Sequence, residues 1–196
     1  MLKRFLLTIT ASLVMASVAW ATPFDEVKKT VDDVVHIVAD KEMKKNEVKR
    51  RQALKKAISN IFDYSEMAKR SLGKHWNNRS AAEKKQFTEL FATLLENSYA
   101  GKIESYNNEK IVYIKDTVDG EYAEIKSKVV TAARDEFTLD YRLFNQNGKW
   151  MVYDVIIEGV SLVSNYRSQF NKIITSGSYD KLVKKLQSKS EELKAP

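Results

Sequence analysis

The spacing of apolar residues changes from helical to alternating near Tyr106. Before that point apolar residues recur every three or four positions, which predicts helices. One helix follows Pro23 and carries valines at helical spacing, a second covers about 45–59, and the longest opens at Ser80–Glu83. The apolar face of the longest helix consists of Phe87, Leu90, Phe91, Leu94 and Leu95, with Tyr99 near its end.

After Tyr106 apolar and polar residues alternate in four short segments, which predicts β-strands. The segments are 111–115, 121–131, 136–144 and 150–157. Linkers as short as Asn147-Gly148 join antiparallel neighbours. The third segment is apolar on one face, whereas the fourth is apolar on both faces apart from Asp154, as expected of a strand that is covered on both sides.

Local signals predict where helices begin and end. Asp63 can cap a helix, with Glu66 completing a capping box, and Gly73 ends that helix. The fourth strand bends at Gly159 into a helix with apolar positions at every fourth residue, and a last basic helix ends near Lys194. Helices, then strands, then helices predict an α+β domain with an antiparallel sheet of about four strands.

The first 21 residues have the three parts of a secretory signal peptide. Lys3 and Arg4 form the positive region, an apolar stretch follows, and Ala19-Trp20-Ala21 matches a small-x-small cleavage site. The stretch is shorter than the roughly 20 apolar residues that cross a membrane. We therefore expect cleavage after Ala21 and a single exported domain over residues 22–196.

Net charge and cysteine content limit the kinds of partner and of binding site that the chain can have. The chain has no cysteine, which excludes a lipid-modified cysteine, a disulfide framework and a thiolate metal site. Its net charge is +7, and removal of Lys3 and Arg4 leaves +5. The positive residues form no cluster interleaved with aromatics, which argues against nucleic acid as a partner. A moderate basic excess favours contact with an acidic surface.

The residues able to do chemistry form no catalytic constellation. His36 and His75 stand in no metal-ligand spacing, and we expect neither a metal site nor a cofactor. Ser161 lacks the second glycine of a nucleophile elbow and is expected to cap the helix after the strand. Asp154 is expected to be buried and bonded to backbone amides, with a general-base role as the alternative. We therefore predict no catalytic residue, and we expect a protein that encloses an apolar ligand and does not act as an enzyme.

One order of motifs is distinctive: it leads from Trp76 through Glu158–Leu162 (EGVSL) to Tyr166–Phe170 (YRSQF). Other motif positions are Phe62-Asp63, Met67, Leu72-Gly73, Ser80, Glu83, Phe87, Phe91, Leu94-Leu95, Gly148-Lys149-Trp150 and Asp154-Val155. With these motifs the chain resembles the MlaC family, also called the toluene-tolerance auxiliary component family. The resemblance covers nearly all of the chain after the signal peptide.

The resemblance implies a fold and a function. The fold would be a curved sheet like that of nuclear transport factor 2, with helices enclosing an apolar cavity. The function would be that of a monomeric periplasmic phospholipid carrier that contributes to outer-membrane lipid asymmetry. Its partners would be an outer-membrane MlaA-like lipoprotein and an inner-membrane ABC transporter with an MCE-domain subunit. A hopanoid or other lipid as cargo, an enzyme on the same cone-shaped fold and a chaperone stay open as alternatives.

We expect the cavity to lie on the apolar face of the sheet, closed by the longest helix and by the helix after Gly159. Its predicted lining, where each side chain could equally fill the core, is Phe87, Phe91, Leu94, Leu95, Tyr99, Leu139, Tyr141, Leu143, Trp150, Val152, Leu162, Tyr166 and Phe170. Arg167 is the candidate contact to a lipid headgroup or a partner, with an ordinary solvated or ion-paired role as the alternative.

Overall fold

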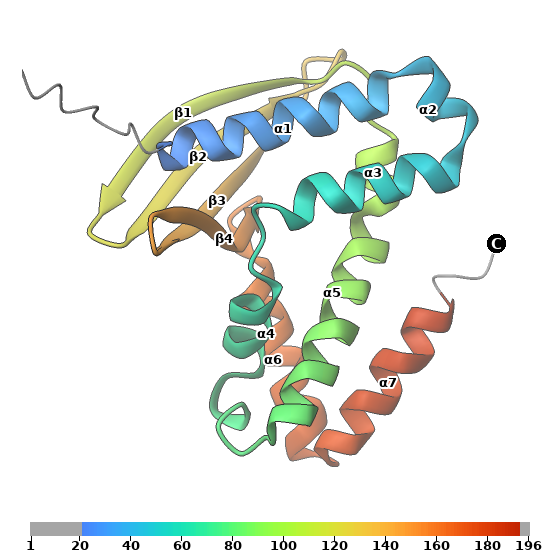
Figure 1. Ribbon diagram of the computed structural model, residues 1–196, viewed down its shortest axis with the longest axis vertical. Helices are drawn as coiled ribbons and strands as arrows, with labels where there is room; N and C mark the ends of the chain where they lie inside the picture. The colour runs from blue at the N-terminus through green and yellow to red at the C-terminus, as the bar shows by residue number, and fades with distance from the viewer. Residues whose placement is uncertain (1–20, 193–196) are drawn as a thin grey trace, which may run out of the picture.

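An antiparallel sheet forms one layer of the fold (Figure 1). The computed structural model describes residues 21–192, so the predicted signal peptide up to residue 20 lies outside the described residues. The strands lie in the sheet in sequence order. They are β1 (Lys110–Asp119), β2 (Tyr122–Val130), β3 (Glu136–Gln146), β4 (Lys149–Ile157) and β5 (Val160–Ser161). The four predicted strands are confirmed, and β5 is an addition.

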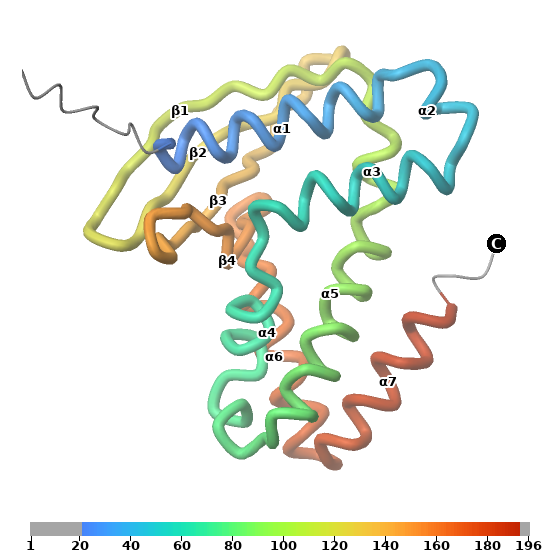
Figure 2. The backbone as a smooth tube through the Cα atoms, viewed as in Figure 1, coloured from blue at the N-terminus to red at the C-terminus, as the bar shows by residue number. Residues whose placement is uncertain are grey.

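The helices form two groups (Figures 1 and 2). One group runs along the sheet and back: α1 (Pro23–Ala39), α2 (Lys41–Lys45) and α3 (Glu47–Ser59). The other forms a bundle beyond the sheet: α4 (Tyr64–Leu72), the 3₁₀ turn η1 (Gly73–His75), α5 (Ala81–Glu104), α6 (Leu162–Thr175) and α7 (Tyr179–Glu192). None of the helices within residues 21–192 is long and apolar enough to cross a membrane. The predicted end of the last helix near Lys194 lies outside the described residues.

Capping side chains set the helix boundaries. At α5 the predicted capping box is present, with Glu83 N donating to Ser80 Oγ (3.2 Å) and Ser80 N to Glu83 Oε2 (2.7 Å). Asp63 caps α4 as predicted, but Glu66 does not close a box there, because Asp63 N donates to Val152 O instead (2.9 Å). The helix predicted over 45–59 is α3, which begins at Glu47 after the cap formed by the side chain of Asn46.

A β-bulge shifts the alternation of side chains along β4. Arg142 pairs with Asp154, and the next residue Leu143 pairs with Val152, so Tyr153 is an extra residue. An extra residue reverses the alternation of side chains along a strand. Trp150, Val152, Val155 and Ile157 therefore share one face, although their numbers change from even to odd.

The buried side chains form two clusters. The sheet cluster joins one face of β2, β3 and β4 to α1 and contains Val27, Ile61, Ala123, Ile125, Tyr141, Leu143, Trp150, Val152, Val155 and Leu162. The bundle cluster lies between α4, α5, α6 and α7 and contains Met67, Ala68, Leu72, Phe87, Phe91, Leu94, Leu95, Val163, Phe170, Tyr179, Leu182, Val183 and Leu186. Phe62 and Tyr99 pack against both clusters and connect them.

A buried carboxylate fixes the passage from β4 into α6. Asp154 is 3% exposed, and it accepts from Val163 N (3.0 Å) and from Ser161 Oγ (2.5 Å). Ser161 Oγ in turn accepts from Ser164 N at 3.0 Å, so Ser161 caps α6 as predicted. Gly159 makes the bend before this cap with φ +75°. The predicted burial of Asp154 and its bond to a backbone amide are confirmed.

We expect Asp154→Ala to lower the free energy of unfolding by about 1–3 kcal/mol, because the buried amide of Val163 and the hydroxyl of Ser161 lose their acceptor. Urea denaturation measures the change. Asp116→Ala, at an exposed position of β1, is the control and should change stability by less than about 0.5 kcal/mol. Equal and small effects of both variants would contradict an anchoring role for Asp154.

Candidate functional site

One apolar face of the sheet lies under α1. Ile125 and Leu143 are 0% exposed and Val152 is 1% exposed on this inner face. Val27 and Val31 of α1 pack against it. We call the contact between α1 and the inner face the seam. The predicted closure by α5 and α6 is corrected here, because the cover is mainly α1.

The seam contains a small gap. Its volume is about 20 Å³, and its lining residues are Val27, Thr30, Val31, Ile61, Phe62, Tyr141 and Val152. Burial raises the pKa of Tyr141, so its hydroxyl keeps its proton at neutral pH. Apart from the hydroxyls of Thr30 and Tyr141, the lining side chains are hydrocarbon. The seam can shield apolar surface from water, and in this closed form it has room for about one water molecule.

The predicted lining residues divide between the two clusters. Those in or against the sheet cluster are Leu139, Tyr141, Leu143, Trp150, Val152 and Leu162. Those in or against the bundle cluster are Phe87, Phe91, Leu94, Leu95, Tyr166 and Phe170. Tyr99 packs on both. The structure brings the first set together at the seam and holds the second set in the bundle.

The bundle set fills its own core. The rings of Phe87 and Phe91 stack with centroids 5.9 Å apart, and Phe170 lies edge-on to them at 5.6 and 5.5 Å. Tyr166 lies edge-on to Phe91 at 5.2 Å. These are the distances of rings in direct contact. The side chains therefore bury one another.

That residues of α1 form one side of the seam was not predicted from the sequence. A signal was present, because the valines of α1 recur at helical spacing, and these are Val27, Val31, Val34, Val35 and Val38. Ile61 and Phe62 gave no such signal, since they lie in the connection between α3 and α4.

Ion pairs hold the far side of the cover, which we define as α1 to α3, Pro23–Ser59. Leu54 is the one buried residue of α2 and α3. Glu104 of α5 has an 11% exposed side chain and pairs with Arg50 Nη2 (3.4 Å) and Arg51 Nε (3.2 Å). Lys55 pairs with Glu96 of α5 at 2.9 Å. Segments with so few buried apolar side chains open at low free-energy cost.

The cover is fixed at its C-terminal end. Val152 N donates to Ile61 O (2.7 Å), and Asp63 N donates to Val152 O (2.9 Å). Phe62 thereby forms an isolated parallel bridge to the middle of β4. This bridge ties the chain after α3 to β4.

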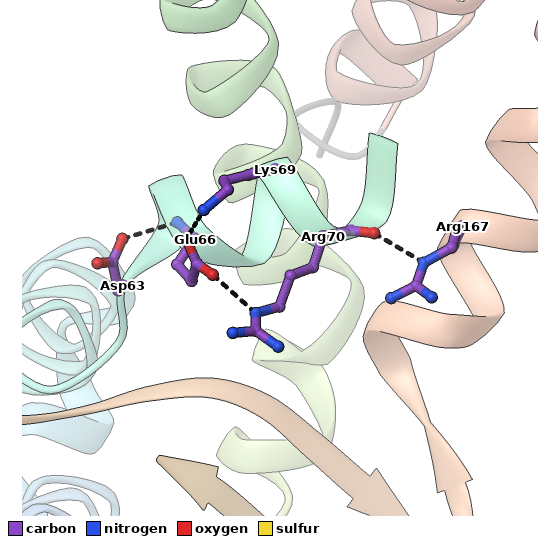
Figure 3. Close-up of polar contacts among 5 residues, drawn as sticks. All are labelled: Asp63, Glu66, Lys69, Arg70 and Arg167. Carbon is purple, nitrogen blue, oxygen red and sulfur yellow. Dashed lines mark hydrogen bonds and ion pairs between the residues drawn. The ribbon is translucent and has the colours of Figure 1, made fainter. Parts of the chain in front are cut away.

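Arg167 lies outside the seam, beside the end of α4 (Figure 3). Its Nε donates to the carbonyl oxygen of Arg70 at 2.8 Å. This carbonyl is one of the last of α4, and such carbonyls have no N–H donor within their own helix. A Cβ at Gly73 would lie 3.4 Å from Arg167 Cδ, and Gly73 has φ +56°. The bond uses Nε and leaves the two terminal guanidinium nitrogens available.

The outer face of the sheet carries a shallow open pocket of about 250 Å³. Arg142 Nε in this pocket lies 3.5 Å from Glu124 Oε1. The guanidinium of Arg70 lies 4.0 Å from the ring centroid of Tyr153, another lining residue, and pairs with Glu66. These arginines are neutralised by side chains of the protein itself, so they make a poor anion site.

The side chains considered as candidates for chemistry form hydrogen bonds with structural roles. His75 Nε2 lies 3.0 Å from Asn171 Oδ1, and Ser161 and Asp154 belong to the cap of α6. Within residues 21–192 no group of three or more His, Cys, Asp or Glu side chains could hold a metal ion. The arrangement offers shielding of hydrocarbon as its main chemical capability.

Comparison with known proteins decides the family, since the model of the MlaC protein family matches residues 28–188. The chain belongs to the MlaC family. It is similar to the toluene tolerance protein ttg2D of Pseudomonas putida, with 29% identity over 86% of this chain and 80% of that protein. It is also similar to the intermembrane phospholipid transport system binding protein MlaC of Haemophilus influenzae, with 27% identity over 62% of this chain and 59% of that protein.

A solved structure shares the fold of this MlaC-family chain. It is the phospholipid-binding protein from Ralstonia solanacearum in complex with a phospholipid, with a TM-score of 0.81, 26% identity, and coverage of 89% of this chain and 100% of that chain. The expected α+β fold with an antiparallel sheet and several helices is confirmed. The MlaC family is one of lipid-binding carriers, which removes the enzyme alternative.

Two of the motifs that carry the resemblance to MlaC proteins meet in the structure. Gly73 and Arg167 are in contact, which links the end of α4 to α6. The motif Glu158–Leu162 forms the turn from β4 through β5 to the first residue of α6. The first contact joins two helices of the bundle, and the second motif joins the sheet to the bundle.

We expect Glu104→Gln to loosen the cover, because Arg50 and Arg51 lose the charge that holds α3 to α5. Amides of α3 should exchange with deuterium about two- to fivefold faster, while amides of α6 and α7 keep their rates. Hydrogen-exchange mass spectrometry measures both. Glu89→Gln, at an exposed position of the same helix, is the control. Unchanged exchange in α3 would show that these ion pairs do not hold the cover.

Proposed function

We propose that this MlaC-family protein carries a phospholipid, with the acyl chains against the inner face of the sheet. The main support for this proposal is that a solved structure of the same fold is a phospholipid-binding protein in complex with a phospholipid. The seam supports the proposal, because here an apolar sheet face lies under a cover that ion pairs hold at its far side. The bundle cluster would serve as the fixed support.

The seam must open for lipid to enter. Its gap of about 20 Å³ is far below the roughly 300–1,000 Å³ of ordinary ligand sites. The cover would swing away from the sheet about the bridge at Phe62, after which acyl chains would take the places of the α1 valines. The ligand contacts that we propose are therefore those of the sheet cluster, together with Tyr99.

The energetics suit a carrier without its own energy source. Two acyl chains contain about 30 carbons, and burying them at roughly 0.8 kcal/mol per methylene is worth on the order of 20 kcal/mol relative to water. Relative to a bilayer the transfer is worth almost nothing, because one hydrocarbon environment replaces another. Release into water would face a barrier of many kcal/mol, so we propose that exchange occurs within complexes with membrane partners.

We propose the two membranes of a Gram-negative cell as donor and acceptor. The Haemophilus relative is named for an intermembrane phospholipid transport system. The signal peptide predicted at the N-terminus would deliver the protein to the periplasm. There it would act as a monomer between an MlaA-like outer-membrane lipoprotein and an inner-membrane ABC transporter with an MCE-domain subunit, and so contribute to outer-membrane lipid asymmetry. Its basic excess would steer it towards acidic surfaces.

Val31→Trp tests the proposal by filling the seam from the side of α1. Val31 is partly buried, so we expect the variant to fold. Native mass spectrometry of protein purified without detergent should show a bound mass of phospholipid size in the wild type and about tenfold less in Val31→Trp. Val48→Trp, at a position 68% exposed on α3, is the control and should load normally. An empty wild type would contradict the carrier, and equal loading of both variants would contradict the seam as the site.

We propose that Arg167 contacts an acidic partner surface, because it lies outside the seam. Arg167→Ala should lower the free energy of unfolding by about 0.5–1.5 kcal/mol through the lost bond to Arg70. It should also slow transfer of labelled phospholipid to vesicles that contain the reconstituted transporter, with no change for bare vesicles. Reduced thermal stability with normal transfer by the folded protein would assign Arg167 to structure alone.

A further inference from the structure

Tyr113 places an unpaired hydroxyl near the seam. It lies on β1 opposite Ser127 of β2, and its ring packs edge-on against Phe24 of α1 with centroids 5.1 Å apart. The ring belongs to the layer of side chains around the sheet cluster. Its Oη is buried, and residues 21–192 give it no hydrogen-bond partner. A buried hydroxyl without a partner destabilises the fold, so this one requires an explanation.

Two polar side chains near Tyr113 already have partners of their own. Ser127 is 0% exposed and donates its hydroxyl to the carbonyl of Leu139. The carboxylate of Asp32 on α1 pairs with Lys28 Nζ at 2.5 Å. Burial first, and the charge of Asp32 second, raise the pKa of Tyr113 to about 12. The Tyr113 hydroxyl is therefore a proton donor at neutral pH that lacks an acceptor.

The polarity of the seam changes from the middle of the sheet to its edge. Near β4 the gap is lined by hydrocarbon, including Ile61, Phe62 and Val152. β1 is the edge strand, and Tyr113 brings a hydroxyl to the inner face there, opposite Ser127 of β2. A two-chain phospholipid likewise changes from acyl carbons to ester carbonyls before its headgroup.

We propose that Tyr113 donates a hydrogen bond to an ester carbonyl of the bound phospholipid. The acyl chains then point towards β4, and the headgroup leaves the seam at the edge formed by β1. This inference rests on the proposed function and adds to it the orientation and depth of the lipid. An ester carbonyl is the first acceptor that the lipid offers after its hydrocarbon, and so it matches a donor placed between the apolar gap and the edge of the sheet.

Such a contact has an asymmetric effect on the two states of the protein. In the empty, closed form the hydroxyl is buried without an acceptor and destabilises the fold. In the loaded form the ester supplies the acceptor. Removal of the oxygen should therefore weaken lipid binding without weakening the empty protein, whereas loss of an ordinary structural hydroxyl weakens the empty protein.

Tyr113→Phe tests this, because it removes one oxygen and keeps the ring against Phe24. The probes are a diacyl phosphatidylglycerol and its dialkyl ether analogue, which lacks both ester carbonyls, each competing with a labelled phospholipid. The wild type should bind the diacyl lipid about two- to tenfold more tightly than the ether lipid. In Tyr113→Phe the diacyl lipid should fall to the level of the ether lipid, whose own affinity should not change.

Tyr106→Phe is the matched control. Its hydroxyl already donates to the carbonyl of Glu109 at 2.8 Å, so this variant should keep the preference for the diacyl lipid.

The melting temperature of lipid-free Tyr113→Phe should equal or exceed that of the wild type, and a lower value would overturn the proposal. An unchanged preference in Tyr113→Phe, or an equal loss for both lipids, would also overturn the ester contact. A wild type that binds neither lipid would overturn the proposed function itself.

Discussion

The contact between the inner face of the sheet and α1 is the interaction on which the rest of the structure depends. The inner face is too apolar to stand in water, since Ile125, Leu143 and Val152 bring only hydrocarbon to it. Some hydrophobic surface must always cover it. In the closed form α1 supplies that surface, and in the proposed loaded form acyl chains supply it. The exchange of one cover for the other replaces hydrocarbon with hydrocarbon, so neither form is strongly favoured over the other.

The two clusters divide the tasks of stability and opening. In the bundle, Phe87, Phe91 and Phe170 contact one another directly, and Asp154 ties the sheet to α6 through buried hydrogen bonds. In the cover, α2 and α3 bury little and depend on pairs such as Arg50 with Glu104. Ion pairs near the surface are weak and sensitive to nearby charge. An acidic or basic partner could therefore compete for them, which a packed aromatic core would not allow.

Local chemistry in the sequence predicted local structure well. The strands, the caps at Ser80 and Ser161, the bend at Gly159 and the burial of Asp154 each depend on a few neighbouring residues, and all are confirmed. Periodicity also identified the apolar faces of the helices. It could not say which helix faces which surface, because a periodic pattern shows that a face is buried but not against what.

The features that needed the structure are those that join distant segments. Glu104 pairs with residues more than fifty positions earlier in the chain, and no local pattern marks such a pair. The bulge at Tyr153 places Trp150 and Val155 on one face, although strict alternation along the sequence would put them on opposite faces. The unpaired hydroxyl of Tyr113 is likewise visible only after α1 is placed over β1.

Imperfect packing of the closed form is physically useful in a carrier. If α1 fitted the inner face without a gap and without an unpaired polar group, every lipid would have to displace a fully satisfied contact. The gap of about 20 Å³ and the hydroxyl of Tyr113 each raise the free energy of the empty, closed protein. A ligand that fills the gap and accepts the hydrogen bond removes both costs. Loading is thereby favoured by a few kcal/mol at most, a margin small enough for a membrane partner to reverse.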